Sequence, residues 1–220
     1  MNAYYTRFVL AWLVSVGAAC TSAPIRYYTL IPPPDKPSRA AQATVAIDVR
    51  VVHIPPQLDR SELMVRTAPT GTTLLENERW ASPMKDEIKD AMRLELQRRL
   101  SGMTGLPSFT LDIDVQRLEA ELGRYALLEA SWSASLSGAG QPPSGARVAS
   151  CTFRADEEIH GGYAGMVEGY QREIAALAEA IVAGLTSSAG GIGIDAPCRT
   201  SIGSAAGGSA PKDHYPAIRQ

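Results

Sequence analysis

Histidine and cysteine are scarce in this chain, which has three of each among 220 residues. Thiolate and imidazole are the ligands that zinc prefers, so a metal centre would have few residues to draw on. His53, His160 and His214 are also scattered, and none belongs to the HExxH pattern of a zinc hydrolase. The sequence therefore predicts neither a bound metal nor another cofactor.

An excess of positive charge is also absent, because the formal net charge is −2. Domains that bind nucleic acid usually carry a basic face that neutralises phosphates, so a nucleic-acid partner is not expected. The GxSxG motif of serine hydrolases is missing as well. Asp112 and Asp114 alternate with apolar residues, which places both carboxylates on the wet face of a strand. We therefore predict that the protein is not an enzyme.

Long hydrophobic runs are missing except near the N-terminus, where residues 8–19 form an apolar stretch behind Arg7. About a dozen apolar residues suit a signal peptide and are too few for a membrane span. Small residues then precede Cys20, as a lipoprotein signal peptidase requires, although Gly17 stands where leucine is usual. We expect a lipid on Cys20. The alternative is an ordinary secretory signal cleaved near Ala19, with Cys20 left as a free thiol.

Composition divides the chain into four parts. Residues 1–19 are the predicted signal peptide, and residues 20–44 are a proline-rich tether carrying the lipid. Tyr27 and Tyr28 are unusual in a linker, so this piece is either a first strand or a docking segment. Residues 45–185 form the folded domain. Residues 186–220 are rich in Ser, Gly and Ala, and we expect them to be disordered because they contain few apolar residues.

Alternating apolar residues predict strands, and apolar residues at helical spacing predict two helices. The strands are expected near 45–52, 63–67, 72–75, 111–116, 128–136 and 149–153. The first helix follows Ser82 as its cap and ends at Gly102, and the second follows Gly161 and Gly162. The predicted fold is a single α+β domain, a mostly antiparallel sheet with two amphipathic helices packed on it.

Two cysteines remain once Cys20 is set aside, and an oxidising compartment permits them to pair. A disulfide between Cys151 and Cys198 would fasten the tail to the strand around Cys151. Alternatively, Cys151 is an ordinary buried thiol and Cys198 is free or pairs between chains.

An ordered set of segments resembles the ABC-type transport auxiliary lipoproteins, which include the PqiC-type subunits. These segments span about residues 20–185, and their later members match more weakly. They are Cys20, residues 27–30 before the prolines, 45–52, Ile54-Pro55, 58–62, Val65-Arg66, 78–83 running into the first helix, 114–118 and Tyr170-Gln171.

The resemblance implies an outer-membrane lipoprotein that faces the periplasm and has no catalytic turnover of its own. Thr21, rather than Asp, follows Cys20, which in Gram-negative bacteria favours sorting to the outer membrane. The implied partners are an Mce-type substrate-binding protein and an inner-membrane permease. Such systems move lipids between the two membranes and support envelope integrity. Because Mce-type partners form rings, the resemblance leaves room for a homo-oligomer. A periplasmic carrier of lipid or another small ligand is the alternative function.

The segments that carry the resemblance also supply candidates for partner binding. Arginine and aromatic residues are frequent anchors of interfaces. The candidates are Tyr28, Leu58, Arg60, Arg66 and Trp80. For Trp80 the sequence leaves two interpretations open, an interface anchor or a core residue at the entrance of the first helix.

Overall fold

The computed structural model describes residues 23–33, 47–104, 106–137, 147–189 and 198–203, which contain two helices and eight strands. The predicted α+β class is confirmed. In chain order the elements are β1 (Arg26–Tyr28), β2 (Ile47–His53), β3 (Glu62–Ala68), β4 (Gly71–Trp80), α2 (Met84–Leu100), β5 (Phe109–Glu121), β6 (Tyr125–Leu136), β7 (Arg147–Glu158), α3 (Gly162–Ala189) and β8 (Cys198–Gly203).

The strands form two mixed sheets rather than one mostly antiparallel sheet. The larger sheet has the order β2-β5-β6-β7-β8, and the smaller has the order β1-β4-β3. The pairs β3–β4, β5–β6 and β6–β7 are antiparallel. The first two follow short turns, whereas ten residues separate β6 from β7. The pairs β1–β4, β2–β5 and β7–β8 are parallel. A long connection separates the two strands of each pair, as parallel pairing requires.

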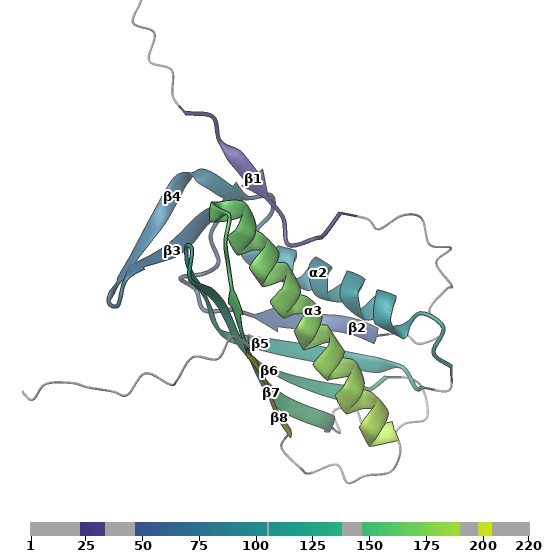
Figure 1. The fold of residues 1–220 in the computed structure, drawn as a ribbon. Coiled ribbons are helices and arrows are strands. Elements are labelled where there is room, and N and C mark those ends of the chain that lie inside the picture. Colours follow the sequence, from purple (N-terminus) through teal and green to yellow (C-terminus); the bar gives the residue numbers. More distant parts are fainter. Residues whose placement is uncertain (1–22, 34–46, 105, 138–146, 190–197, 204–220) are drawn as a thin grey trace, which may run out of the picture.

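Both helices cover the same face of the five-stranded sheet (Figure 1). The strand residues that point toward the helices are buried and apolar, and they include Leu111, Ile113, Ala130, Trp132, Phe153 and Ala155. Their neighbours in sequence point to the opposite, open face and are polar, as period-two alternation requires. They include Thr110, Asp112, Asp114, Ser131, Ser133 and Thr152. The apolar core therefore lies between one sheet face and two helices.

Gly184 lets α3 approach the sheet closely. A Cβ atom at Gly184 would lie 2.7 Å from the Trp132 ring, closer than a side chain tolerates. At the start of the same helix, Gly161 and Gly162 have φ values of 81° and 68°, which favour glycine. This confirms the glycine turn predicted before the second helix.

The structure describes both ends of the domain further than the sequence could. Residues 26–28 form strand β1, one of the two interpretations that the sequence left open for this piece, so the folded part starts well before residue 45. Within the tail that was expected to be disordered from residue 186, α3 continues to Ala189 and residues 198–203 form β8 beside β7, while residues 190–197 and 204–220 lie outside the described residues. Main-chain pairing with an existing strand explains both cases, since it requires few apolar side chains.

The entrance of α2 also differs from the prediction. Pro83, not Ser82, occupies the N-cap position, and no side chain caps the helix. The Ser82 hydroxyl donates instead to the Glu87 carboxylate at 2.8 Å.

Candidate functional site

Three of the five predicted partner-binding residues line one hollow between the small sheet and the helices. Leu58, Arg60 and Trp80 meet there, although more than twenty positions separate the first from the last. The other lining residues are Gln57, Glu62, Met64, Met84, Leu118 and Tyr170. The hollow thus joins the loop before β3, β3 itself, the end of β4, the start of α2, the last part of β5 and α3.

The loop that follows β2 presents Leu58 and Arg60 at this hollow through turn hydrogen bonds. The Leu58 amide donates to the Pro55 carbonyl at 2.9 Å, and the Arg60 amide donates to the Leu58 carbonyl at 2.8 Å. At the end of the loop, the Trp80 amide donates to the Ser61 carbonyl at 2.7 Å. These main-chain bonds fix the loop against the end of β4 and leave its side chains free for other contacts.

Trp80 forms the floor of the hollow and does not project from the surface, since only 4% of it is exposed. Its ring lies 6.4 Å from the Tyr170 ring at an interplanar angle of 43°, within the range of favourable aromatic pairs. Burial raises the pKa of the Tyr170 hydroxyl well above its usual value, so this hydroxyl stays protonated. The structure therefore makes Trp80 a core residue that a partner could reach only through the hollow.

Arg60 is the exposed cation at the rim. Its guanidinium makes no hydrogen bond or ion pair with any residue in the described part of the chain. The nearby Glu62 carboxyl has a lowered pKa, mainly through a hydrogen bond from its own backbone amide and further through the charges of Arg79 and Arg60. Arg60 thus offers a positive charge that no hydrogen bond or ion pair with a described residue engages.

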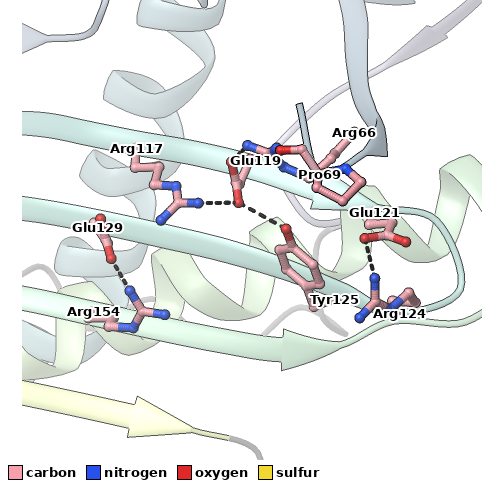
Figure 2. Close-up of polar contacts among 9 residues, drawn as sticks. All are labelled: Arg66, Pro69, Arg117, Glu119, Glu121, Arg124, Tyr125, Glu129 and Arg154. Carbon is pink, nitrogen blue, oxygen red and sulfur yellow. Dashed lines mark hydrogen bonds and ion pairs between the residues drawn. The ribbon is translucent and has the colours of Figure 1, made fainter. Parts of the chain in front are cut away.

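Arg66 lies apart from this hollow, in a polar network on the open side of the large sheet. It donates to the Glu119 carboxylate at 2.6 Å and to the Pro69 carbonyl at 2.7 Å. Figure 2 shows Arg66, Arg117 and Tyr125 gathered around Glu119. Burial acts to raise the pKa of Glu119, but these hydrogen bonds outweigh it and the pKa is lowered. Arg66 therefore joins the small sheet to the large one.

Tyr28 is also engaged within the fold. Its hydroxyl donates to Glu78 at 2.8 Å, and its register partner across the sheet is Trp80. Burial, and then the hydrogen bond to Glu78, raise the pKa of Tyr28. Glu78 is 5% exposed and also pairs with Arg26 at 2.6 Å. Tyr28 thus supports the hollow from behind and does not line it.

Glu87 is a second buried carboxylate that holds the N-terminal segment, and sequence patterns did not predict it. It lies in the first turn of α2 and is 3% exposed. It accepts hydrogen bonds from the Thr29 hydroxyl and the Leu30 amide, both at 2.8 Å, and from the backbone and side chain of Ser82. Its position in the stretch of charged residues that opens α2 resembles an exposed helix face, which is why sequence reasoning missed it.

Cys151 is disulfide-bonded in the structure. Its register partner across the parallel β7–β8 ladder is Cys198. The predicted bond between Cys151 and Cys198 would join the last strand to the sheet, and we keep that pairing as a proposal.

A catalytic metal cluster is not found in the part of the chain that the structure describes, where no three His, Cys, Asp or Glu residues gather. Asp112 instead pairs with Arg50, whose Nε lies 3.0 Å from the Asp112 carboxylate. Asp114 is exposed on the same open face. None of the described helices is long and apolar enough to span a bilayer.

Comparison with protein families identifies the chain. The model of a family described as the ABC-type transport auxiliary lipoprotein component matches residues 28–182. The chain belongs to this family. This auxiliary lipoprotein is therefore a membrane-anchored accessory of an ABC-type transport system. The matched region contains the whole lining of the hollow.

Two solved structures share the fold of this auxiliary lipoprotein. A protein from Xanthomonas campestris, described as a member of the family DUF330, has a TM-score of 0.54 and 20% identity, over 76% of this chain and 97% of its own. An uncharacterised protein has a TM-score of 0.54 and 18% identity, over 73% and 98%. No curated protein matches the auxiliary lipoprotein.

Proposed function

We propose that this chain is a non-catalytic, outer-membrane lipoprotein subunit of a PqiC type. Its role would be to dock an Mce-type substrate-binding protein, and through it an inner-membrane permease, in a system that moves lipids between the membranes and supports envelope integrity. The single observation that carries the docking role is the convergence of Leu58 and Arg60 on a hollow floored by Trp80.

The size of the hollow favours docking over storage of a ligand. Its volume is about 20 Å³, which is room for about one water molecule. Pockets that enclose drug-sized ligands have volumes of roughly 300–1,000 Å³. The hollow is therefore suited to the end of one partner side chain, with Arg60 beside it as an anchor for a carboxylate or carbonyl. This argues against a carrier that would hold an acyl chain at this place.

The anchor is the second part of the proposal. A lipid on Cys20 would attach the chain to a membrane, and several acyl chains on one residue hold far better than a single chain. Thr21 in the following position supports the outer membrane as the destination. The module would then meet, from the outer-membrane side, a partner that extends from the inner membrane.

Site-specific photo-crosslinking in cells tests the docking surface. A photoreactive residue at Arg60 should crosslink to the Mce-type protein, identified by mass spectrometry. The matched control is Arg98, an arginine that is 41% exposed and already paired with Glu95. Arg98 lies about 21 Å along the axis of α2 from Met84, which lines the hollow.

The two positions separate the alternatives. If Arg60 yields no more adduct than Arg98, the hollow is not the docking surface. If the protein extracted in mild detergent carries about one lipid molecule per protein molecule, the result supports the carrier function instead of docking.

A further inference from the structure

Large apolar side chains are exposed around strand β1. Ile25 is 46% exposed, Tyr27 is 64% exposed and Ile31 is 40% exposed. These three residues, which we call the β1 patch, fall within seven positions of one another. Exposed apolar side chains that gather next to a folded core are a common mark of a membrane or protein contact.

The fold holds the β1 patch outward. Arg26 and Tyr28 point to the inner side of the small sheet, where both reach Glu78. Because strand residues alternate, Tyr27 between them must point to the outer side. Its register partner there is Arg79, which is engaged with Glu62.

The end of the segment is fixed in the same way. Leu30 is fully buried, and its amide donates to Glu87 at 2.8 Å. Ala81 also donates its amide to the Tyr28 carbonyl at 2.7 Å. Ile31 follows Leu30, and its amide donates to the Thr29 hydroxyl at 3.1 Å while its side chain is exposed. The exposure of the patch is thus built into the domain and is not a property of a loose terminus.

The length of chain before the patch indicates what lies beside it. Only five positions separate Ile25 from Cys20. Fully extended, five residues span at most about 18 Å. A lipid on Cys20 would therefore keep β1 within about 18 Å of the bilayer, and β1 is fixed to the whole domain.

We infer that the β1 patch contacts the phospholipid surface that holds the anchor, with Tyr27 in the headgroup layer and Ile25 and Ile31 beside it. Tyrosine is enriched at that layer because its ring is apolar and its hydroxyl is polar. The domain would then lie against the membrane. The proline-rich composition of residues 20–44 instead suggested a tether that holds the domain away from it. This inference rests on the proposed lipidation of Cys20.

Fluorescence quenching by lipids tests the inference on the full chain. The variant Tyr27→Trp is expressed with its leader, extracted and reconstituted in vesicles of phosphatidylethanolamine and phosphatidylglycerol with brominated acyl chains. Trp80 and Trp132 are buried and give a constant background. The control is Gln97→Trp, at an exposed position near the far end of α2. A second reporter, Ile25→Trp, guards against misfolding at one position, and unchanged melting temperatures confirm the fold.

The expected result is quenching of the Tyr27→Trp and Ile25→Trp reporters at least about twofold stronger than that of Gln97→Trp, because only the former reach the bilayer interface. Equal quenching of all three variants, with the acylated protein still on the vesicles, overturns the inference and leaves the anchor intact. A blue-shifted Tyr27→Trp emission without quenching also overturns it, since the patch would then contact protein. A chain that lacks acyl mass and does not float with vesicles removes both the anchor and the inference.

Discussion

The two sheets of this protein are held in different ways. The five-stranded sheet and its helices are joined by apolar side chains, among which Leu111, Leu177 and Ile181 are almost fully buried. The segment around β1 is joined to the small sheet and to α2 by two buried carboxylates, Glu78 and Glu87. Apolar packing gives the large sheet its stability, whereas directional hydrogen bonds fix where the N-terminal segment leaves the domain. For a protein that is anchored to a membrane by its N-terminal segment, that exit point sets the orientation of the domain relative to the membrane.

The charges show the same contrast. On the open face of the large sheet, arginines pair with acidic neighbours. Arg50 pairs with Asp112, and Arg154 pairs with Glu129 (Figure 2). At the rim of the hollow, Arg60 has no such partner among the described residues. The open face of the large sheet therefore presents paired charges, whereas the loop before β3 presents a cation that remains available for binding.

The largest expected effect concerns a buried acid in the apolar part of the molecule. Glu173 on α3 is fully buried, and neither of its carboxyl oxygens forms a hydrogen bond with a described residue. Burial, and then the charges of Glu157 and Asp156, raise the pKa of Glu173 from 4.5 to about 9. The folded protein thus keeps a proton that the unfolded chain releases, so the free energy of unfolding must fall as pH rises from 4.5 toward 9.

Between pH 5 and pH 8 this group alone should lower the free energy of unfolding by about 4 kcal/mol. Denaturant titrations at several pH values measure it. Glu173→Gln, which cannot ionise, should lose most of that slope. An unchanged slope in the variant would show that Glu173 does not titrate as its surroundings imply.

The second prediction separates the two faces of the large sheet. Leu111→Ala should lower the free energy of unfolding by about 3 kcal/mol, because it leaves a cavity beneath the helices. Thr110→Ala, its neighbour on the open face, should change it by less than about 0.5 kcal/mol. Chemical denaturation of both variants tests this, and similar losses would contradict the assignment of one packed face and one open face.

The third prediction concerns the carboxylate that holds β1. Glu87→Ala should lower the free energy of unfolding by about 2 kcal/mol, because the buried Leu30 amide loses its acceptor. Hydrogen exchange should rise at the amides of Leu30 and Ser82, both of which donate to Glu87. Glu87→Gln keeps an acceptor oxygen and should cost less. Faster exchange throughout the large sheet, instead of in this segment, would mean that β1 is not an independently attached element.

The smallest effect on stability is expected at the rim of the hollow. Arg60→Ala should change the free energy of unfolding by less than about 0.5 kcal/mol, because Arg60 is exposed and unpaired. It should nonetheless reduce co-purification of the partner from detergent extracts, whereas Arg98→Ala should not. Full recovery of the partner with Arg60→Ala would remove Arg60 from the docking surface.

Periodicity was sufficient to predict β2, β5, β6 and β7 of the large sheet and the two helices that cover it. The alternation along β5 and β6 located the hairpin, and the apolar stripe from Met84 to Leu100 located α2. It did not predict β8 and left β1 as one of two interpretations, because both strands join their sheets through main-chain pairing with distant strands and so leave little apolar pattern. The split into two sheets was missed for the same reason, because strand order depends on long-range pairing.

The candidate site was foreseen in part. Leu58, Arg60 and Trp80 could be named from short segments that resemble a family, but only the fold shows that they share a hollow with Tyr170. Arg66 illustrates the limit, since its partner Glu119 lies 53 positions away. Glu87 and Glu173 also escaped notice, because an acidic residue in a helix usually faces water and its burial depends on tertiary contacts.

Attachment to a membrane through Cys20 is the claim on which both the docking proposal and the β1 patch depend. The most direct test is an intact, non-reduced mass of the native protein extracted from membranes. We predict a species that begins at Cys20, carries acyl mass and lacks the two hydrogens that a Cys151–Cys198 disulfide removes. An unmodified chain cleaved near Ala19, or one that keeps residues 1–19, would contradict the account.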